Sequence, residues 1–393
     1  MRILSILLFF ITFSSVTYAE TTFKGYLRTG IGLSSDGGDQ VCFKLPGASG
    51  KYRLGNECEN YAELGLDHDL QLGEDDAFSP KLKYHGMLAF VADGDEDAEQ
   101  YAPAFRNNYV SVSKLISTKT SMAMWVGKRF YGRNDIHIND YFYWDTTGPG
   151  MGIENYDLGF SKFSYGFLEN NDAEGDSSLT HDIRFSDIEL GDGTLTLGLA
   201  LGQVSNRDET VGENTEGWSV NLLHKKNIFG GDNTLSVQYG SGGLSDPGKR
   251  NNPKANSDDT SMRITNQIVF NALSDWSSMW VFIYEDSEVN NASTTWLSLG
   301  TRPQYHVTDR TSVAIEYGFD QVKPESETAR ELHKLTLAAQ YAVSRDFWSR
   351  LVFQFFVTMA SWNSAADFAG VDVDNVFSGQ SGLTFGGQVE TWW

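Results

Sequence analysis

The sequence predicts an all-β fold, a transmembrane antiparallel β-barrel preceded by an export signal. Three observations predict it. Apolar and polar residues alternate with a period of two in segments along the whole chain, and the first residues have the pattern of a cleavable signal. No later stretch approaches the ~18 apolar residues of a membrane-spanning helix. A chain of this kind can cross a membrane only as a closed barrel, which satisfies its backbone hydrogen bonds in lipid.

The predicted export signal occupies residues 1–19. Arg2 supplies the positive charge, the following residues are apolar, and Thr17-Tyr18-Ala19 forms a small-residue cleavage site. The apolar stretch is shorter than the ~20 residues that a spanning helix needs. We therefore expect a mature protein of one domain, residues 20–393, in the outer membrane of a Gram-negative bacterium.

The C-terminal segment shows the alternation most clearly. One face of an extended strand over 383–393 carries Leu383, Phe385, Val389 and Trp393. The opposite face carries Thr384, Gln388, Glu390 and Trp392. The same pattern occurs in segments that contain Phe23 to Leu33, Tyr61 to Asp67, Val313 to Asp320 and Trp348 to Met359. Each segment is therefore predicted to be a strand with one apolar face.

A soluble β-sandwich would show the same alternation, because it also buries one face of each strand. Two features favour the barrel. A chain of 393 residues is long for a sandwich with one core, and its last residue, Trp393, is an aromatic on the apolar face, which suits an interfacial girdle. The hydrophobic content of only 40% fits barrel strands, which are apolar on one side.

The charge and the two cysteines restrict the partners. A formal charge of −22 argues against nucleic acid as a binding partner.

Cys42 and Cys58 are the only cysteines, and in an exported protein a disulfide between them is the simplest interpretation. A zinc site is the alternative, but no cysteine or histidine pair at finger spacing accompanies them.

Catalytic patterns are absent from the sequence. It has no nucleophile elbow, zincin motif, P-loop or dinucleotide-binding glycine motif. The glycine-rich run 148–152 contains Pro149 and is predicted to be a tight turn, and the seven histidines are dispersed. The 52 carboxylates always offer some pair for glycoside hydrolysis, but their spacing selects none. We predict no catalytic residues, no cofactor and no metal.

Two sets of residues suggest a binding function. Aromatic side chains stand on the polar faces of the predicted strands at Tyr26, Tyr61, Trp348 and Trp392. They either fill the interior of a narrow barrel or offer flat apolar surfaces to a sugar ring. The second set is a group of mixed charges: Arg28, Arg53, Glu63, Arg106, Arg133, Asp135 and Asp140. Such groups can exchange hydrogen bonds with sugar hydroxyls, form ion pairs that brace the barrel wall, or do both.

Four segments resemble the maltoporins, the trimeric maltodextrin-selective porins of Gram-negative outer membranes: FKGYLRTGIG (23–32), KYRLGNECE (51–59), WVGKRFY (125–131) with the stretch 140–152 after it, and ETWW (390–393). The resemblance implies an 18-stranded barrel, a homotrimer in outer-membrane lipid, and an inward-folded loop at 135–144 that narrows the pore. It also implies that malto-oligosaccharides diffuse passively along an aromatic slide, onto which Tyr26, Tyr61, Trp348 and Trp392 fall. The charged set then forms the flanking polar track. Members of the family also serve as phage receptors.

The chain departs from the family pattern at three places. The tryptophan at the family's pore mouth falls within 95–101, where Tyr101 is offered as a substitute. Another slide aromatic aligns with Asp232, with Phe229 nearby, and the constriction tyrosine aligns with Phe142. These changes leave open a general pore, or one that prefers sucrose or another glycoside. A secreted carbohydrate-binding or hydrolytic β-protein is the alternative from another class.

Overall fold

The computed structural model describes residues 20–71, 80–93, 102–115, 121–171, 177–204, 215–371 and 376–393. Within these ranges the chain is almost entirely β-structure, and no helix among them is long and apolar enough to cross a membrane. The elements, in chain order, are β1 (Thr21–Ser34), β2 (Glu59–Gln71), β3 (Lys81–Asp93), β4 (Ala104–Ser113), β5 (Ala123–Arg129), β6 (Asn134–Ile136), η2 (His137–Asn139), β7 (Tyr141–Trp144), β8 (Gly148–Asp157), β9 (Lys162–Asn171), β10 (Ser177–Leu190), β11 (Gly193–Val204), β12 (Gly217–Ile228), β13 (Gly231–Gly242), β14 (Thr260–Leu273), β15 (Trp276–Val289), β16 (Ala292–His306), β17 (Thr311–Pro324), β18 (Arg330–Ala342), β19 (Val352–Trp362), α1 (Ser364–Phe368) and β20 (Ser381–Trp392).

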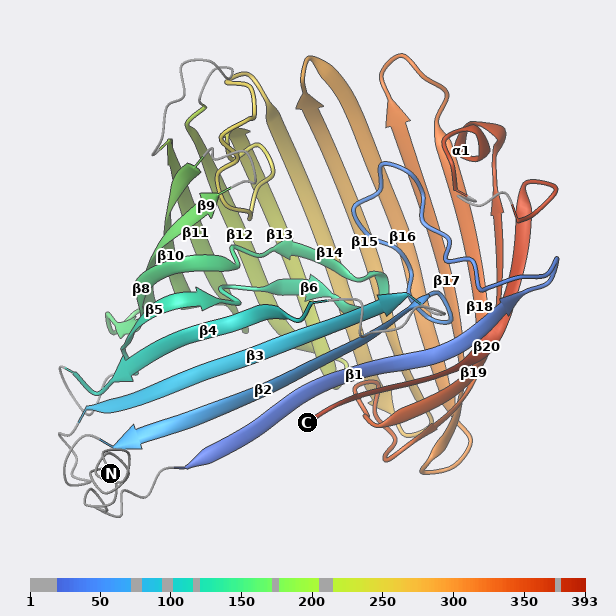
Figure 1. The fold of residues 1–393 in the computed structure, drawn as a ribbon, viewed down its shortest axis with the longest axis horizontal. Coiled ribbons are helices and arrows are strands. Elements are labelled where there is room, and N and C mark those ends of the chain that lie inside the picture. The colour runs from blue at the N-terminus through green and yellow to red at the C-terminus, as the bar shows by residue number, and fades with distance from the viewer. Residues whose placement is uncertain are drawn as a thin grey trace, which may run out of the picture.

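The strands of the described residues form one closed, 18-stranded antiparallel barrel (Figure 1). Each strand pairs with the next along the chain, and β5 pairs with β8 across the segment that contains β6 and β7. The first strand, β1, pairs with β2 on one side and with the last strand, β20, on the other, which closes the sheet. The predicted fold, an 18-stranded transmembrane barrel, is therefore confirmed.

The predicted alternation decides which side chains face outward. Along β19 buried and exposed residues alternate without interruption. Phe355 is 75% exposed on the outer face, whereas Thr358 is fully buried on the inner face. The same holds at the chain start, where Phe23 and Ile31 are 71% and 76% exposed. An apolar outer surface over a polar interior is the arrangement that lipid requires of a barrel.

The hydrophobic core lies between the barrel wall and segments that fold into the lumen. Residues 35–58 form the first loop, and residues 130–147 form the inward loop, which includes β6, η2 and β7. Figure 1 shows the first loop, in blue, running inside the barrel. One buried cluster joins Leu45 of the first loop, Ile136 and Trp144 of the inward loop, and Met279 of the wall. The inward-folded loop that the family resemblance implied is therefore present.

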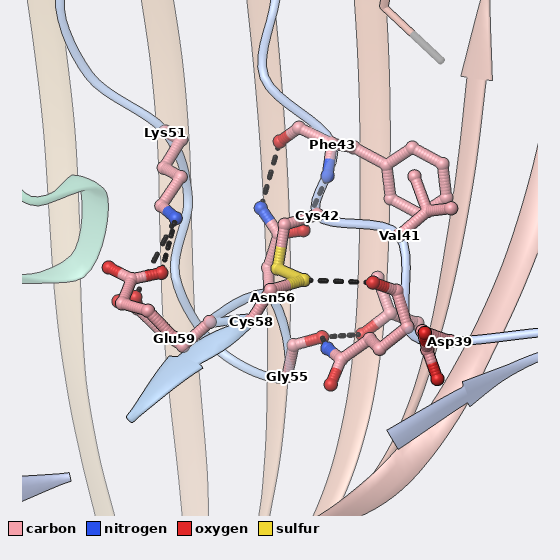
Figure 2. The surroundings of a disulfide bond; sticks show 12 residues. Asp39, Val41, Cys42, Phe43, Lys51, Gly55, Asn56, Cys58 and Glu59 are labelled. Atoms are coloured by element: carbon pink, nitrogen blue, oxygen red, sulfur yellow. Dashed lines mark hydrogen bonds and ion pairs between the residues drawn. A yellow bond between two sulfur atoms is a disulfide. The ribbon is translucent and has the colours of Figure 1, made fainter. Parts of the chain in front are cut away.

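The first loop is closed at its base by the predicted disulfide. Cys42 and Cys58 are bonded, with their Cα atoms 5.9 Å apart (Figure 2). Asn56 reinforces the closure, because its side chain accepts from the backbone N–H of Phe43 and donates to the carbonyl of the same residue. The two ends of the loop are thus joined covalently and by an amide that imitates a strand pairing.

Two local predictions are wrong. Residues 148–152 begin strand β8 and do not form a tight turn. A Cβ at Gly152 would overlap the backbone carbonyl of Tyr165 on β9 and stand 2.9 Å from the Trp125 indole nitrogen, so a glycine there lets β8 pass close to both. Trp348 belongs to the 343–351 turn before β19, and not to a strand. That turn is stabilised by Asp346, whose carboxylate accepts from the backbone N–H of Trp348.

We predict that replacing Cys42 and Cys58 by serine leaves the barrel able to form but lowers its free energy of unfolding by about 3 kcal/mol, the loop-closure value for a separation of 16 residues. Denaturant unfolding in detergent micelles, followed by tryptophan fluorescence, measures the change. Wild-type protein in reducing agent should show the same loss. An unchanged midpoint in both would contradict the prediction.

Candidate functional site

A cavity of about 620 Å³ lies in the lumen between the inward loop and the wall formed by β1, β2, β4 and β20. Aromatic rings stand mainly on the wall. Of the nine charged residues in the lining, four stand on the wall strands, four on the inward loop and one, Arg53, on the first loop. Its lining residues are Tyr26, Arg28, Arg53, Glu59, Tyr61, Glu63, Arg106, Phe130, Arg133, Asp135, His137, Asp140, Phe142, Asp145, Thr147 and Trp392.

The structure brings most of the predicted site residues to this cavity. All seven charged residues line it, together with Phe142 and with three of the predicted slide aromatics, Tyr26, Tyr61 and Trp392. Trp348 does not line the cavity. Its ring centroid lies 5.2 Å from that of His137, which is a lining residue. Tyr101 lies outside the described residues. Period-two alternation had placed Tyr26, Tyr61 and Trp392 on inward faces, and strand pairing now makes them neighbours.

The inward loop has an apolar face and a polar face. Ile136 and Ile138 are fully buried against the wall, while Asp135 and His137, which alternate with them, line the cavity. The chain then turns back at Asp140, which adopts a left-handed conformation with φ of 52°. Aspartate tolerates this conformation better than most residues. The alternation within 135–138 therefore directs polar side chains at the pore and apolar ones at the wall.

Buried arginines from the wall hold the inward loop in place. Arg263 of β14 is 2% exposed, and its guanidinium pairs with Glu285 and Asp246 while it donates to the carbonyl of Tyr143 in the loop. On the opposite flank, Arg184 of β10 pairs with Asp182 and donates to the loop at the carbonyl of Gly132. Each guanidinium thus joins the barrel wall to a backbone carbonyl of the inward loop, and the two arginines hold both flanks of the loop.

The hydroxyl groups of the two wall tyrosines are already bonded within the protein. The Tyr26 hydroxyl donates to Glu390 at 2.7 Å and accepts from Arg53 at 2.9 Å. The Tyr61 hydroxyl donates to Glu63 at 2.6 Å, and the two rings meet edge to face at 5.9 Å. The hydrogen bonds hold the rings in fixed orientations, and what the rings can offer a ligand is apolar surface.

The charged residues brace the wall as well as lining the cavity. Arg28 pairs with Glu57 at 3.1 Å and with Glu59 at 2.6 Å, and its side chain is 7% exposed. Arg53 pairs with Glu57 at 2.7 Å and with Glu390 at 3.0 Å. The bracing interpretation therefore holds for Arg28 and Arg53, and hydrogen bonding of the charged set to sugar hydroxyls stays a prediction. A guanidinium has five donors, so pairing with a carboxylate does not exhaust its capacity to bind a hydroxyl.

Phe142 stands where the resemblance expected a tyrosine, and it supports an arginine. The Arg133 guanidinium lies 3.9 Å from the Phe130 ring centroid and 4.2 Å from that of Phe142. Such cation–π contacts contribute about 0.5–2 kcal/mol each. Arg133 is thus held by contacts with two rings, with Asp145 3.7 Å away, and the cavity has no phenolic hydroxyl at Phe142.

His137 is a site residue that the sequence did not single out. Its Nε2 lies 2.8 Å from a nitrogen of Arg350, and its Nδ1 lies 3.4 Å from one of Arg53. A guanidinium can only donate, so the short contact requires a lone pair on the ring. Burial, and then the charge of Arg53, lower the pKa of His137 well below its ordinary value. His137 is therefore neutral. In the sequence, its place two residues after Asp135 was the only indication that it would line the cavity.

Phe229 does not replace the slide aromatic that the resemblance expected at Asp232. Phe229 lies in the turn between β12 and β13, is 58% exposed, and packs on Phe270 at 5.6 Å between ring centroids. Phe270 follows the inward Val269, so both phenylalanines belong to the outer surface. Asp232 leaves that stretch of the inner wall polar.

The arrangement suits weak, sequential contacts with a neutral, hydroxyl-rich molecule. Rings that present apolar surface share the cavity with guanidinium and carboxylate groups. Within the described residues, no group of three or more His, Cys, Asp or Glu side chains could hold a metal ion. The site offers positioned hydrogen-bond partners.

We predict that selectivity for cations over anions through the lumen decreases as pH is lowered through the pKa of Asp135, because the cavity then loses a negative charge. The protein surrounding the cavity partly desolvates this carboxyl, and that burial raises its pKa above the ordinary value despite Arg133, with Asp140 adding to the rise. Asp135 therefore loses its charge at a higher pH than an ordinary aspartate does. His137, whose pKa is lowered, adds no step near neutral pH.

Reversal potentials across a salt gradient, recorded as a function of pH, measure this preference. Asp135→Asn should abolish the step, whereas Asp309→Asn, at a carboxylate 91% exposed in a turn, should retain it. A wild-type curve unchanged by Asp135→Asn would contradict the assignment.

Comparison with known proteins identifies the family. The LamB porin family matches residues 21–393. Among solved structures, Acinetobacter baumannii OccAB1 has 8% sequence identity and a TM-score of 0.53, over 95% of this chain and 96% of that one. The outer membrane protein opdK of Pseudomonas aeruginosa has 10% identity and a TM-score of 0.51, over 95% and 99%. These two similarities concern the fold alone. The chain belongs to the LamB porin family, and it is a β-barrel porin of the Gram-negative outer membrane.

Proposed function

We propose that this porin mediates passive, binding-site-assisted diffusion of maltose and malto-oligosaccharides across the outer membrane. The observation that carries the proposal is the facing arrangement of the cavity. Tyr26, Tyr61 and Trp392 stand on three adjacent strands, and the donors and acceptors of the inward loop stand opposite them. No step consumes energy, because the sugar moves down its gradient.

Strand pairing sets the order of the rings. Tyr26 of β1 pairs directly with Trp392 of β20, and Arg28 of β1 pairs with Tyr61 of β2. The three rings therefore follow a diagonal across the inner wall. A glucose ring has an apolar face of C–H groups, which can contact one aromatic after another along this diagonal. The groups of the cavity lining that would exchange hydrogen bonds with sugar hydroxyls are Arg28, Arg53, Glu63, Arg106, Arg133, Asp135 and Asp140.

Weak binding is part of the proposed mechanism. A sugar held tightly would not leave, so each contact needs to be replaced by the next at little cost. The arginines are suited to this exchange, because their pairing with carboxylates keeps them in place when no sugar is bound. Trp392 is similarly steadied by the Arg350 guanidinium, 4.1 Å from its ring centroid.

Export and assembly are proposed together with this function. We infer that residues 1–19 are removed on export and that the mature chain, residues 20–393, is one barrel domain that assembles as a homotrimer. The resemblance to maltoporins supports the trimer, and the signal pattern supports the cleavage. The same resemblance supports a role for surface loops as a phage receptor.

A general or differently selective pore is the second candidate. Two positions favour it: Phe142 offers no hydroxyl at the constriction, and Asp232 stands where the family has a slide aromatic. Phe229 does not compensate, because it packs on the outside. Sucrose or another glycoside would then be the preferred solute.

We predict that maltotriose blocks the ion current of single channels in a planar bilayer at lower concentration than sucrose does. The elongated sugar can contact several rings of the diagonal at once, whereas sucrose has only two rings. Stepwise block of three equal conductances would also support the trimer. Channels indifferent to both sugars would indicate a general pore, and preferential block by sucrose would support the second candidate.

We further predict that Trp392→Ala weakens maltotriose block by about tenfold, equivalent to ~1.4 kcal/mol, while the conductance without sugar changes little. The matched control is Trp280→Ala, which removes a tryptophan that is 54% exposed on the outer face of β15. The control should bind maltotriose like the wild type. Unchanged affinity in Trp392→Ala would remove this residue from the slide.

A further inference from the structure

Two glycines face each other across adjacent strands of the barrel wall. Gly300 of β16 and Gly318 of β17 are direct pairing partners. A Cβ added to either one would overlap the ring of Tyr52, which belongs to the first loop. These two residues form the glycine socket, a flat floor on which the Tyr52 ring rests. Tyr52 is 2% exposed, and its hydroxyl lies 2.9 Å from Ser298.

The backbone that follows Tyr52 is bonded to the same wall. The N–H of Leu54 donates to the Glu316 carboxylate at 3.0 Å, and the Leu54 carbonyl accepts from Lys334 at 3.0 Å. The next carbonyl, that of Gly55, accepts from Thr358 at 2.9 Å. The segment 52–55 is therefore attached to four consecutive strands, β16 to β19, and has little freedom to move.

Arg53 lies between these anchors and points the other way, into the lumen. Its guanidinium donates to the Tyr26 hydroxyl at 2.9 Å and pairs with Glu390 at 3.0 Å. Its backbone N–H donates to the carbonyl of Ile138 at 3.0 Å, which ties the first loop to the tip of the inward loop. The position of Arg53 thus affects both sides of the cavity, the aromatic wall and the constriction.

We propose that Tyr52, seated in the glycine socket, is a positioning residue that sets the pore aperture and the sugar affinity through Arg53. The glycines are required because only a residue without a side chain lets the ring approach the sheet so closely. Tyr52 itself touches no solute. The part of the proposal that concerns sugar rests on the proposed function, whereas the part that concerns the aperture applies to any solute.

Two variants test the contact between the Tyr52 ring and the glycine socket. Tyr52→Ala removes the ring, and Gly318→Ala fills the floor beneath it. Both should displace Arg53, raise the sugar concentration for half block by about tenfold or more, and increase open-channel current noise. Tyr52→Phe keeps the ring and loses only the contact with Ser298, so it should restore affinity to within about twofold of the wild type. Gly387→Ala is the matched control, because its methyl would meet the outward Phe355 at an ordinary 3.4 Å.

A double-mutant cycle separates positioning from general loosening of the barrel. In an Arg53→Ala background, Gly318→Ala should have no further effect on sugar affinity, because the residue through which it acts is gone. Equal effects of Gly318→Ala with and without Arg53 would overturn the proposal. So would a folded Gly318→Ala channel with wild-type affinity and noise. If Tyr52→Ala does not insert, Gly318→Ala and Tyr52→Phe still decide the question.

Failure of the positioning role of Tyr52 can be distinguished from failure of the proposed function. If wild-type channels ignore both maltotriose and sucrose, the proposed function fails, and the conductance and noise of the same variants then test the aperture. Unchanged conductance and noise in Gly318→Ala would in that case overturn the positioning role on its own.

Discussion

Closure of the hydrogen-bonded sheet is the constraint on which the rest of this structure depends. Lipid offers no partner to a backbone N–H or C=O, so the pairing of β1 with β20 removes the last free edge. Barrels of this strand number leave a wide aqueous lumen that their own side chains do not fill. The bore must then be set by segments inserted from the loops, and here the first loop and the inward loop do so.

Inserted loops bring their own backbone groups into the barrel, and those groups need partners. Buried charged side chains of the wall provide them: Arg263 and Arg184 for the inward loop, Glu316 and Lys334 for the first loop. Removing one member of such a buried pair costs about 3–5 kcal/mol, because the other charge is left uncompensated. The polar side chains inside the barrel therefore hold the inserted loops in place, and the residues that line the cavity are the innermost of them.

Much of the site could be predicted because strand alternation is local. Whether Tyr26, Tyr61 or Trp392 faces inward follows from its parity within a strand, and the structure has them inward. Parity fails where the chain leaves the strand. Trp348 was assigned a strand face but lies in a turn, and residues 148–152 look like a turn but begin β8. In both places the outcome depends on distant neighbours, such as the Trp125 ring against Gly152.

The sequence by itself favoured the barrel and the disulfide, and it indicated the inward and outward faces of the segments that alternate clearly and most of the charged and aromatic lining. These depend on period-two patterning and on motifs that are contiguous in the chain. Only the tertiary structure decided how the lumen is filled. His137 became a site residue because Arg53 and Arg350 approach it from other segments, and a Cβ at Gly300 would overlap a ring only because Tyr52 lies over it. Both contacts join residues far apart in sequence, and no local pattern encodes them.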